Sequence, residues 1–321
     1  MVKLLKLFDH KIVLFLIASG VTLLALPFFL QGYWLHLVIE ILILALFATS
    51  LNLIVGYTGM ISFGQAGFYG LGLYTVAVML KGTALPFYLI LVTASITAAV
   101  AGLIVGFISV RRQGMYFAIL TLAFGQLIWA IIFKWRKVTG GEDGMIGVPI
   151  PEILSSEVNL YFFILIACVF CIALLYWITN TPFGRVLSAI RENAERTECV
   201  GINVDRYRLI AFVISTFFSG LAGGLYCIVA GGAFPDLVAW GKSGEVLLVC
   251  VLGGIFTFLG PTLGAAMMIL LQSTVGAFFI ERWPLILGAI FILVALGLPE
   301  GVLGTIQDKL ALHFHKEGGE R

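Results

Sequence analysis

Long apolar stretches separated by short polar connections run along almost the whole chain. A helix needs about 20 predominantly apolar residues to cross the hydrocarbon core of a membrane. Counted at that length, the pattern predicts about ten crossing helices. We place them at residues 12–30, 34–56, 61–80, 86–110, 115–133, 159–180, 209–231, 243–258, 261–280 and 284–298. The expected fold is an all-α polytopic transmembrane helical bundle, a single domain over residues 1–321.

Glycines and polar side chains interrupt this pattern between the second and third predicted helices. Residues 60–70 have the sequence Met-Ile-Ser-Phe-Gly-Gln-Ala-Gly-Phe-Tyr-Gly. Irregular backbone is tolerated at membrane depth only where protein or a water-filled cavity surrounds it. The glycines either serve close helix packing alone or mark a break beside a transport pathway. Ser62 and Gln65 favour the break, because close packing does not need their hydrogen-bonding groups.

Composition agrees with a membrane protein. Hydrophobic residues make up 61% of the chain, charged residues only 11%, and the mean hydropathy is +1.09. A soluble chain of this length would need a far more charged surface. The net charge of +2 is too small to suggest a nucleic-acid partner. Cys168 and Cys171 form a C-x-x-C inside an apolar segment, where we expect packing rather than redox or metal chemistry.

The basic residues predict an orientation. With the N-terminus inside, thirteen of the 19 Lys and Arg residues fall on the cytoplasmic side. This asymmetry predicts a multi-pass protein of the plasma membrane with both termini cytoplasmic. The eighth predicted helix is short, and without it the C-terminal tail would face outward.

Two connections are longer than the others. The outer one, 134–158, contains glycines and acids typical of ordered turns. The inner one, 181–208, predicts a helix, a turn and a helix, with stop signals at Gly201 and Asn203. A charged amphipathic helix between spans either lies on the lipid surface or docks in a groove of a cytoplasmic protein. Its mixed charges favour the protein partner.

A membrane-embedded enzyme or a proton-coupled carrier is less favoured. The chain lacks an H-E-x-x-H motif, and His10, His36, His313 and His315 lie near helix ends or in tails, so we expect no metal site and no cofactor. Acids within the predicted spans are scarce. Glu40 is expected to face the bundle or reach toward the interface, and Glu245 to face a helix dipole from the first turn of the eighth helix.

Several ordered motifs resemble one known family. They are Gly-Tyr-Thr-Gly-Met at 56–60 followed by Ser-Phe-Gly-Gln-Ala-Gly-Phe at 62–68, the run at 115–125, Thr-Gly-Gly at 139–141, Gly-Arg at 184–185 with Ala-Ile-Arg-Glu-Asn at 189–193, and glycines at 253–254 and 260. Together they resemble the permease subunits of branched-chain amino acid ABC importers, specifically the M-type member of the H and M pair. An H-type subunit would carry Asn-Phe-Ala-His-Gly near 62–66.

The resemblance implies a set of partners: an H-type permease subunit, two cytoplasmic ABC ATPase subunits and an extracytoplasmic amino-acid-binding protein. The chain has no G-x-x-x-x-G-K-[ST] motif, so ATP must bind elsewhere and the chain is a transport subunit rather than an enzyme. The resemblance makes 181–208 the coupling loop. Its candidate contacts with the ATPase are Arg185, Arg191, Glu192, Glu195 and Gly201.

The implied cargo is leucine, isoleucine or valine, with urea or a short amide as the alternative. A zwitterion needs weak sites for both charged ends, which neutral dipoles provide. The polar candidates near breaks or midplane are Asn52, Ser62, Gln65, Thr121, Gln126, Ser215 and Ser219. Each of these could instead bond to a neighbouring backbone or helix.

Overall fold

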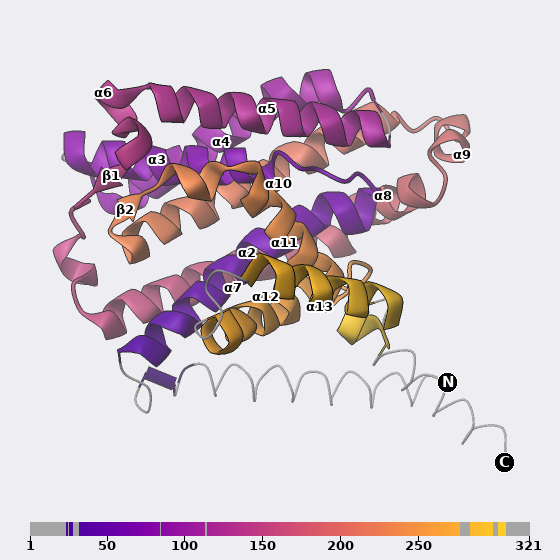
Figure 1. Ribbon diagram of the computed structural model, residues 1–321. Coiled ribbons are helices and arrows are strands. Elements are labelled where there is room, and N and C mark those ends of the chain that lie inside the picture. Colours follow the sequence, from indigo (N-terminus) through magenta and orange to yellow (C-terminus); the bar gives the residue numbers. More distant parts are fainter. Residues whose placement is uncertain are drawn as a thin grey trace, which may run out of the picture.

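The computed structural model describes residues 32–83, 85–112, 114–276, 283–297 and 301–305, together with Leu24, Leu26 and Pro27. These residues form a bundle of helices with one two-stranded sheet (Figure 1). The predicted helix 12–30 lies outside the described residues apart from those three, as do His10, His313 and His315.

Five helices are long and apolar enough to cross a membrane: α2 (Tyr33–Thr58), α4 (Phe87–Ser109), α5 (Met115–Lys134), α7 (Glu157–Asn180) and α10 (Val204–Ala230). Each overlaps a predicted span. Four further helices overlap the rest, namely α3 (Gln65–Gly82), α11 (Trp240–Gly253), α12 (Gly260–Leu271) and α13 (Trp283–Gly297). The polytopic helical fold is thereby confirmed.

Helix α10 lies at the centre and packs against α2, α3 and α4. Glycines make this possible. A Cβ atom at Gly72 of α3 would lie 1.9 Å from the carbonyl oxygen of Gly220, and one at Gly223 of α10 would lie 1.9 Å from that of Tyr69. Such small residues let the backbones of membrane helices approach closely, where packing and not water exclusion drives association.

The two long connections lie at opposite ends of the bundle (Figure 1). At the sheet end, α6 (Arg136–Thr139), η1 (Gly141–Asp143), β1 (Met145–Ile146) and η2 (Glu152–Leu154) follow α5. Strand β1 pairs antiparallel with β2 (Gly232–Ala233), which continues into η3 (Pro235–Val238). At the other end, which we call the α8 end, lie α8 (Pro182–Glu192) and α9 (Ala194–Cys199).

Two predicted boundaries in the inner loop are wrong. The predicted helix running up to Gly201 is divided at Asn193, whose backbone is extended (φ −158°, ψ 103°) and whose side chain accepts a hydrogen bond from the Arg196 N–H at 2.9 Å. Asparagine at that position caps the start of a new helix. Asn203 caps α10 in the same way, so α10 begins at Val204 rather than at 209.

Two later boundaries are also wrong. The eighth predicted helix was placed at 243–258, but α11 runs from Trp240 to Gly253, and residues 254–259 are not helical. The ninth was placed at 261–280, but α12 ends at Leu271 and continues as a π turn, η4 (Gln272–Gly276). At a rise of 1.5 Å per residue, α11 is about 21 Å long, shorter than the roughly 30 Å hydrocarbon core.

Candidate functional site

The polypeptide breaks between α2 and α3. Helix α2 ends at Thr58 and is capped by Gly59, which has φ 73°, and the Met60 N–H donates to the Ile54 carbonyl at 3.2 Å. The chain then runs back from the α8 end as a non-helical segment, residues 60–64 (Figure 1). Helix α3 begins only at Gln65, four residues later than the sequence predicted. The broken segment expected from the glycines and Ser62 is therefore present, and the start predicted at 61 is wrong.

Side chains from two other helices accept hydrogen bonds from backbone N–H groups that the break leaves without helical partners. The Phe63 N–H donates to Thr121 Oγ1 of α5 at 3.2 Å, and the Ala66 N–H donates to Ser243 Oγ of α11 at 2.8 Å. A Cβ atom at Gly64 would lie 2.2 Å from the Thr121 carbonyl oxygen, so only glycine fits between the break and α5. Ser243 was not a sequence candidate. Its partner is 177 residues away, and no local pattern announces such a contact.

Three of the predicted pathway residues meet in one buried polar cluster. Gln65 Nε2 donates to Ser215 Oγ at 2.7 Å and to Ser219 Oγ at 2.9 Å. Ser215 Oγ donates to the Ser50 carbonyl at 2.6 Å, and the hydroxyls of Ser50 and Ser219 lie 2.9 Å apart. All four side chains are fully buried within the chain. The cluster therefore joins the start of α3 to the middle of α2 and α10.

Four pathway candidates carry a buried polar atom that has no hydrogen-bond partner among the described residues. These atoms are Asn52 Oδ1, Ser62 Oγ, Gln65 Oε1 and Gln126 Nε2. Leaving such a group unsatisfied costs about 1–3 kcal/mol, and most buried polar groups in proteins have a partner. Asn52 uses its amide nitrogen, which donates to the Thr257 carbonyl at 3.3 Å, so only its oxygen is free. Unused hydrogen-bonding capacity is thus present at the break, in Ser62 and Gln65, and also elsewhere in the bundle, for example at Tyr74 and Arg208.

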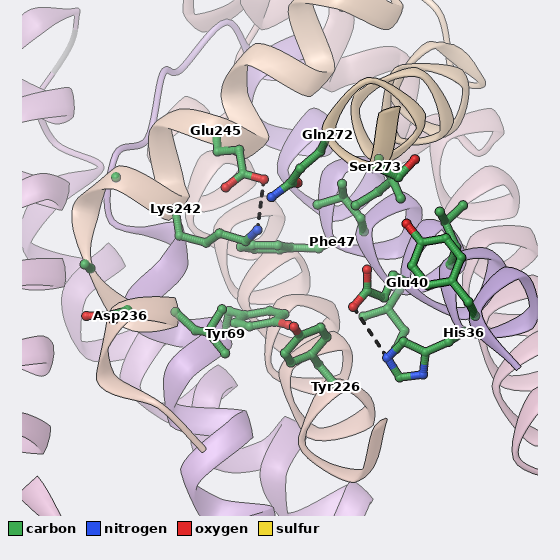
Figure 2. Close-up of a pocket in the computed structure, with 18 residues that line it drawn as sticks. His36, Glu40, Phe47, Tyr69, Tyr226, Asp236, Lys242, Glu245, Gln272 and Ser273 are labelled. Atoms are coloured by element: carbon green, nitrogen blue, oxygen red, sulfur yellow. Dashed lines mark hydrogen bonds and ion pairs between the residues drawn. The ribbon is translucent and has the colours of Figure 1, made fainter. Parts of the chain in front are cut away.

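A cavity of about 670 Å³ opens between α2, α3, α10, α11 and the π turn (Figure 2). Three acids, Glu40, Asp236 and Glu245, line it together with Lys242 and His36. Lys242 Nζ lies 3.0 Å from Glu245 Oε1, and His36 Nε2 lies 3.7 Å from Glu40 Oε1. The expectation that Glu245 sits in the first helical turn and faces the dipole is wrong, because α11 begins at Trp240 and Glu245 pairs with Lys242.

Aromatic rings form the apolar wall of this cavity. Phe47 and Tyr69 stack with their ring centroids 4.6 Å apart, and Tyr226 lies against Tyr69 at 6.2 Å. Glu40 faces the interior of the bundle, as expected, and points toward these rings from across the cavity (Figure 2). The sequence had singled out none of the aromatic residues. Their spacing along the helices looks the same as that of ordinary packing residues.

At the α8 end, Arg191 joins three elements. Its guanidinium donates to the Gly56 carbonyl near the end of α2 and lies 5.0 Å above the ring of Phe256 in the α11–α12 connection. A Cβ atom at Gly59 would lie 3.2 Å from Arg191 Cγ. Helix α8 is therefore attached to the start of the first break and to the second non-helical connection.

The other coupling candidates are solvent-exposed. Helix α8 buries Gly184, Leu187 and Ile190 on one face, and the exposed residues are Arg185, Glu192, Glu195 and Gly201. Gly201 has φ +91°, which favours glycine for its backbone conformation, and nothing lies within 4 Å of the position that a Cβ atom would occupy. Arg191 differs from this group because its charge is directed into the protein.

A multi-pass helical bundle with a broken helix, unused polar groups beside the break and a large cavity is the architecture of a membrane permease. The chain belongs to the family of permease components of branched-chain amino acid transport systems, whose family model matches residues 33–295.

The relatives agree with this assignment. The chain is 28% identical to the high-affinity branched-chain amino acid transport system permease protein LivM of Salmonella typhimurium, over 96% of this chain and 79% of that protein. It matches LivM of Escherichia coli to the same extent. It is 24% identical to LivH of Salmonella typhimurium over 81% of this chain and 91% of that protein. The M-type resemblance is thereby confirmed. No solved structure matches.

Proposed function

We propose that this chain forms one half of the membrane pore of an ATP-driven importer for leucine, isoleucine and valine. The observation that carries the proposal is the break at residues 60–64, around which Asn52, Ser62 and Gln65 hold polar atoms without partners among the described residues. Neutral dipoles of this kind can replace part of the hydration of a zwitterion without holding it tightly. The names of the LivM and LivH relatives supply the cargo.

The pathway in this proposal passes the polar cluster at the start of α3. Gln65, Ser215 and Ser219 are closed against one another, so a conformational change must part α3 from α10 before substrate passes. Thr121 belongs to the pathway wall through its contact with Phe63, and Gln126 through its unused amide nitrogen. The apolar surfaces around them accept the branched side chain.

The proposed complex contains an H-type permease subunit as the other half of the pore, two cytoplasmic ABC ATPases and an extracytoplasmic amino-acid-binding protein. The pairing of LivM-like and LivH-like subunits supports the first of these. ATP binds to the ATPases and not to this chain, which carries no phosphate-binding glycine motif. Helix α8 docks the ATPase through its exposed face, and Arg191 transmits the movement to the break.

In this arrangement the α8 end faces the cytoplasm and the sheet end faces outward, with both termini inside the cell. The distribution of basic residues supports this orientation, because the inner loop carries Arg185, Arg191, Arg196 and Arg206. The whole chain is one permease domain within the plasma membrane.

Liposomes that contain the full complex test the proposal. With ATP inside the liposomes and binding protein outside, the complex should take up labelled leucine, isoleucine or valine. Leaving out the ATPases, a permease subunit or the binding protein should abolish this uptake. Urea and a short amide are offered in parallel as the alternative cargo. Uptake of urea without uptake of branched-chain amino acids would reject the substrate, and robust uptake without any ATPase would reject the class.

A further inference from the structure

The cavity at the sheet end differs from ordinary membrane-protein packing in its charged groups. A charged side chain at the centre of a membrane helix costs about 2.5–3.5 kcal/mol on insertion scales, and such residues mark functional positions by default. Here Glu40 lies in α2, while Lys242 and Glu245 lie in α11, and all three face one cavity. Its volume of about 670 Å³ lies within the roughly 300–1,000 Å³ typical of small-molecule sites.

The charges in the cavity are unevenly paired. Lys242 and Glu245 neutralise each other at 3.0 Å, and each side chain is 21% exposed. Glu40 has only His36 beside it, at 3.7 Å, and has no Lys or Arg partner among the described residues. Figure 2 shows Glu40 across the cavity from the Lys242–Glu245 pair. The cavity therefore offers one carboxylate without a cationic partner and one ion pair on the opposite wall.

The wall between these charges is aromatic. Tyr69 is only 3% exposed and lines the cavity. Tyr226 lines the same cavity as Glu40 and Glu245. Phe47 stacks on Tyr69, which gives a rigid apolar surface. Tyr226, which is half-buried, adds the accessible part of this wall, and its ring surface accepts an aliphatic side chain.

We propose that this cavity is a reception site for the zwitterionic amino acid on its way to the break. The ammonium group pairs with Glu40, the carboxylate pairs with Lys242, and the aliphatic side chain lies against Tyr226 and Tyr69. This assignment rests on the proposed function. Glu245 is the resting partner of Lys242, so the lysine is paired both before and after the ligand enters. Binding breaks the Lys242–Glu245 pair and forms two pairs with the ligand, but it leaves Glu245 without a cationic partner. The cost of that unpaired carboxylate offsets part of the gain, so the site holds its ligand weakly, as a transport pathway requires.

The cavity also selects by charge. Two carboxylates, Glu40 and Glu245, face one lysine among the described lining residues, and the exposed Asp236 lies at the edge of the lining (Figure 2). An amine-bearing ligand is therefore attracted, and a ligand with only a carboxylate is repelled. This distinguishes leucine from 4-methylpentanoate, which has the same side chain and carboxylate but no ammonium group.

Thiol protection tests the site in the complete complex in liposomes. Cys199 is the exposed cysteine of the chain, and the other four are buried, so Cys199→Ser gives a silent background. Gln272→Cys, beside the Lys242–Glu245 pair, then places one thiol in the cavity (Figure 2). The thiol is treated with a cationic trimethylammonium thiosulfonate or with an anionic sulfonate thiosulfonate, each with and without leucine. The rate of modification is measured from the increase in mass of this chain.

Leucine should slow modification of Gln272→Cys several-fold, whereas 4-methylpentanoate should not. The cationic reagent should modify the thiol faster than the anionic one. Glu40→Gln should lower the ratio of the cationic rate to the anionic rate by about tenfold, which corresponds to a loss of about 1.4 kcal/mol of electrostatic attraction. Ile146→Cys, which is exposed in β1 outside the cavity, is the control and should be insensitive to leucine. Ser273→Cys replaces Gln272→Cys if that variant fails to assemble.

The site and the function fail in different ways. If the complex imports leucine but leucine protects neither Gln272→Cys nor Ser273→Cys, the reception site is wrong and the transport proposal stands. Equal protection by 4-methylpentanoate would overturn the role of Glu40. If the complex imports no branched-chain amino acid, the proposed function fails, whatever the labelling shows.

Discussion

Replacing Gly72 by alanine should separate α3 from α10 and thereby damage transport. The added Cβ atom would lie 1.9 Å from the Gly220 carbonyl oxygen, while ordinary van der Waals contact begins at 3.4 Å. The helices must therefore move apart by about 1.5 Å at this point, a strain of the overpacking kind that typically costs about 1–3 kcal/mol. Gly220 is also packed closely against α4, because a Cβ atom added there would lie 2.3 Å from Ala98 Cβ, so α10 has little room to move in that direction.

The functional consequence follows from the position of Gln65, two helical turns from Gly72 on the same helix. Its hydrogen bonds to Ser215 and Ser219 measure 2.7 and 2.9 Å, and a displacement of about 1.5 Å is larger than such bonds tolerate. The polar cluster should open in the resting state. We expect Gly72→Ala to lower the melting temperature of the purified permease pair by several degrees and to reduce coupled leucine uptake.

Gly82→Ala is the matched control on the same helix. Gly82 is exposed at the end of α3, and nothing lies within 4 Å of its Cβ position. This substitution should leave both the melting temperature and uptake within experimental error of the parent protein, or raise stability slightly, since alanine is the better helix former. Unchanged stability and uptake in Gly72→Ala would refute the close approach of α3 and α10.

Three further predictions concern the break, the coupling helix and the orientation. Gln65→Leu should slow leucine uptake several-fold, because it removes the donor to both serines and the unused oxygen, while Cys168→Ala in the packed C-x-x-C should leave the rate unchanged. Arg191→Gln should leave the ATPases bound in a pull-down but lower the amount of leucine imported per ATP hydrolysed. Arg185→Glu on the exposed face should instead weaken the binding of the ATPases. Equal effects of the two substitutions on ATPase binding would contradict the separation of their roles. In intact cells an impermeant maleimide should label Ile146→Cys but not native Cys199. In inverted vesicles it should label Cys199 but not Ile146→Cys. Labelling of both thiols from one side would overturn the proposed topology.

The hydrophobic pattern was sufficient to predict the bundle and most of its helices, because the length of an apolar run relates directly to the thickness of a membrane. Helices α2, α4, α5 and α7 lie within a few residues of their predicted places. The break before α3 was also predictable. Glycines together with Ser62 and Gln65 have a local meaning, since irregular backbone in a membrane needs both space and hydrogen-bonding partners.

Some boundaries were missed because local hydrogen bonds decided them. Asn193 and Asn203 end one helix and begin the next by capping an N–H three residues onward. Asn203 was expected as a stop signal, but asparagine is compatible with both a turn and a helix surface, so periodicity alone did not locate the cap at Asn193. The end of α11 was missed for a related reason, because residues 254–259 form a non-helical connection against α2. The end of α12 was missed because the chain continues from Leu271 as a π turn.

By itself, the sequence determined that this is a membrane permease and that its chain breaks near Gly64. Only the tertiary structure decided which groups meet there: Ser243 from α11 caps α3 across 177 residues, and Glu40 and Lys242 face one cavity from opposite walls. The physical reason is the range of the interactions. Burial of apolar residues and backbone satisfaction act on each segment alone, whereas a hydrogen bond or ion pair between distant helices depends on how those helices pack.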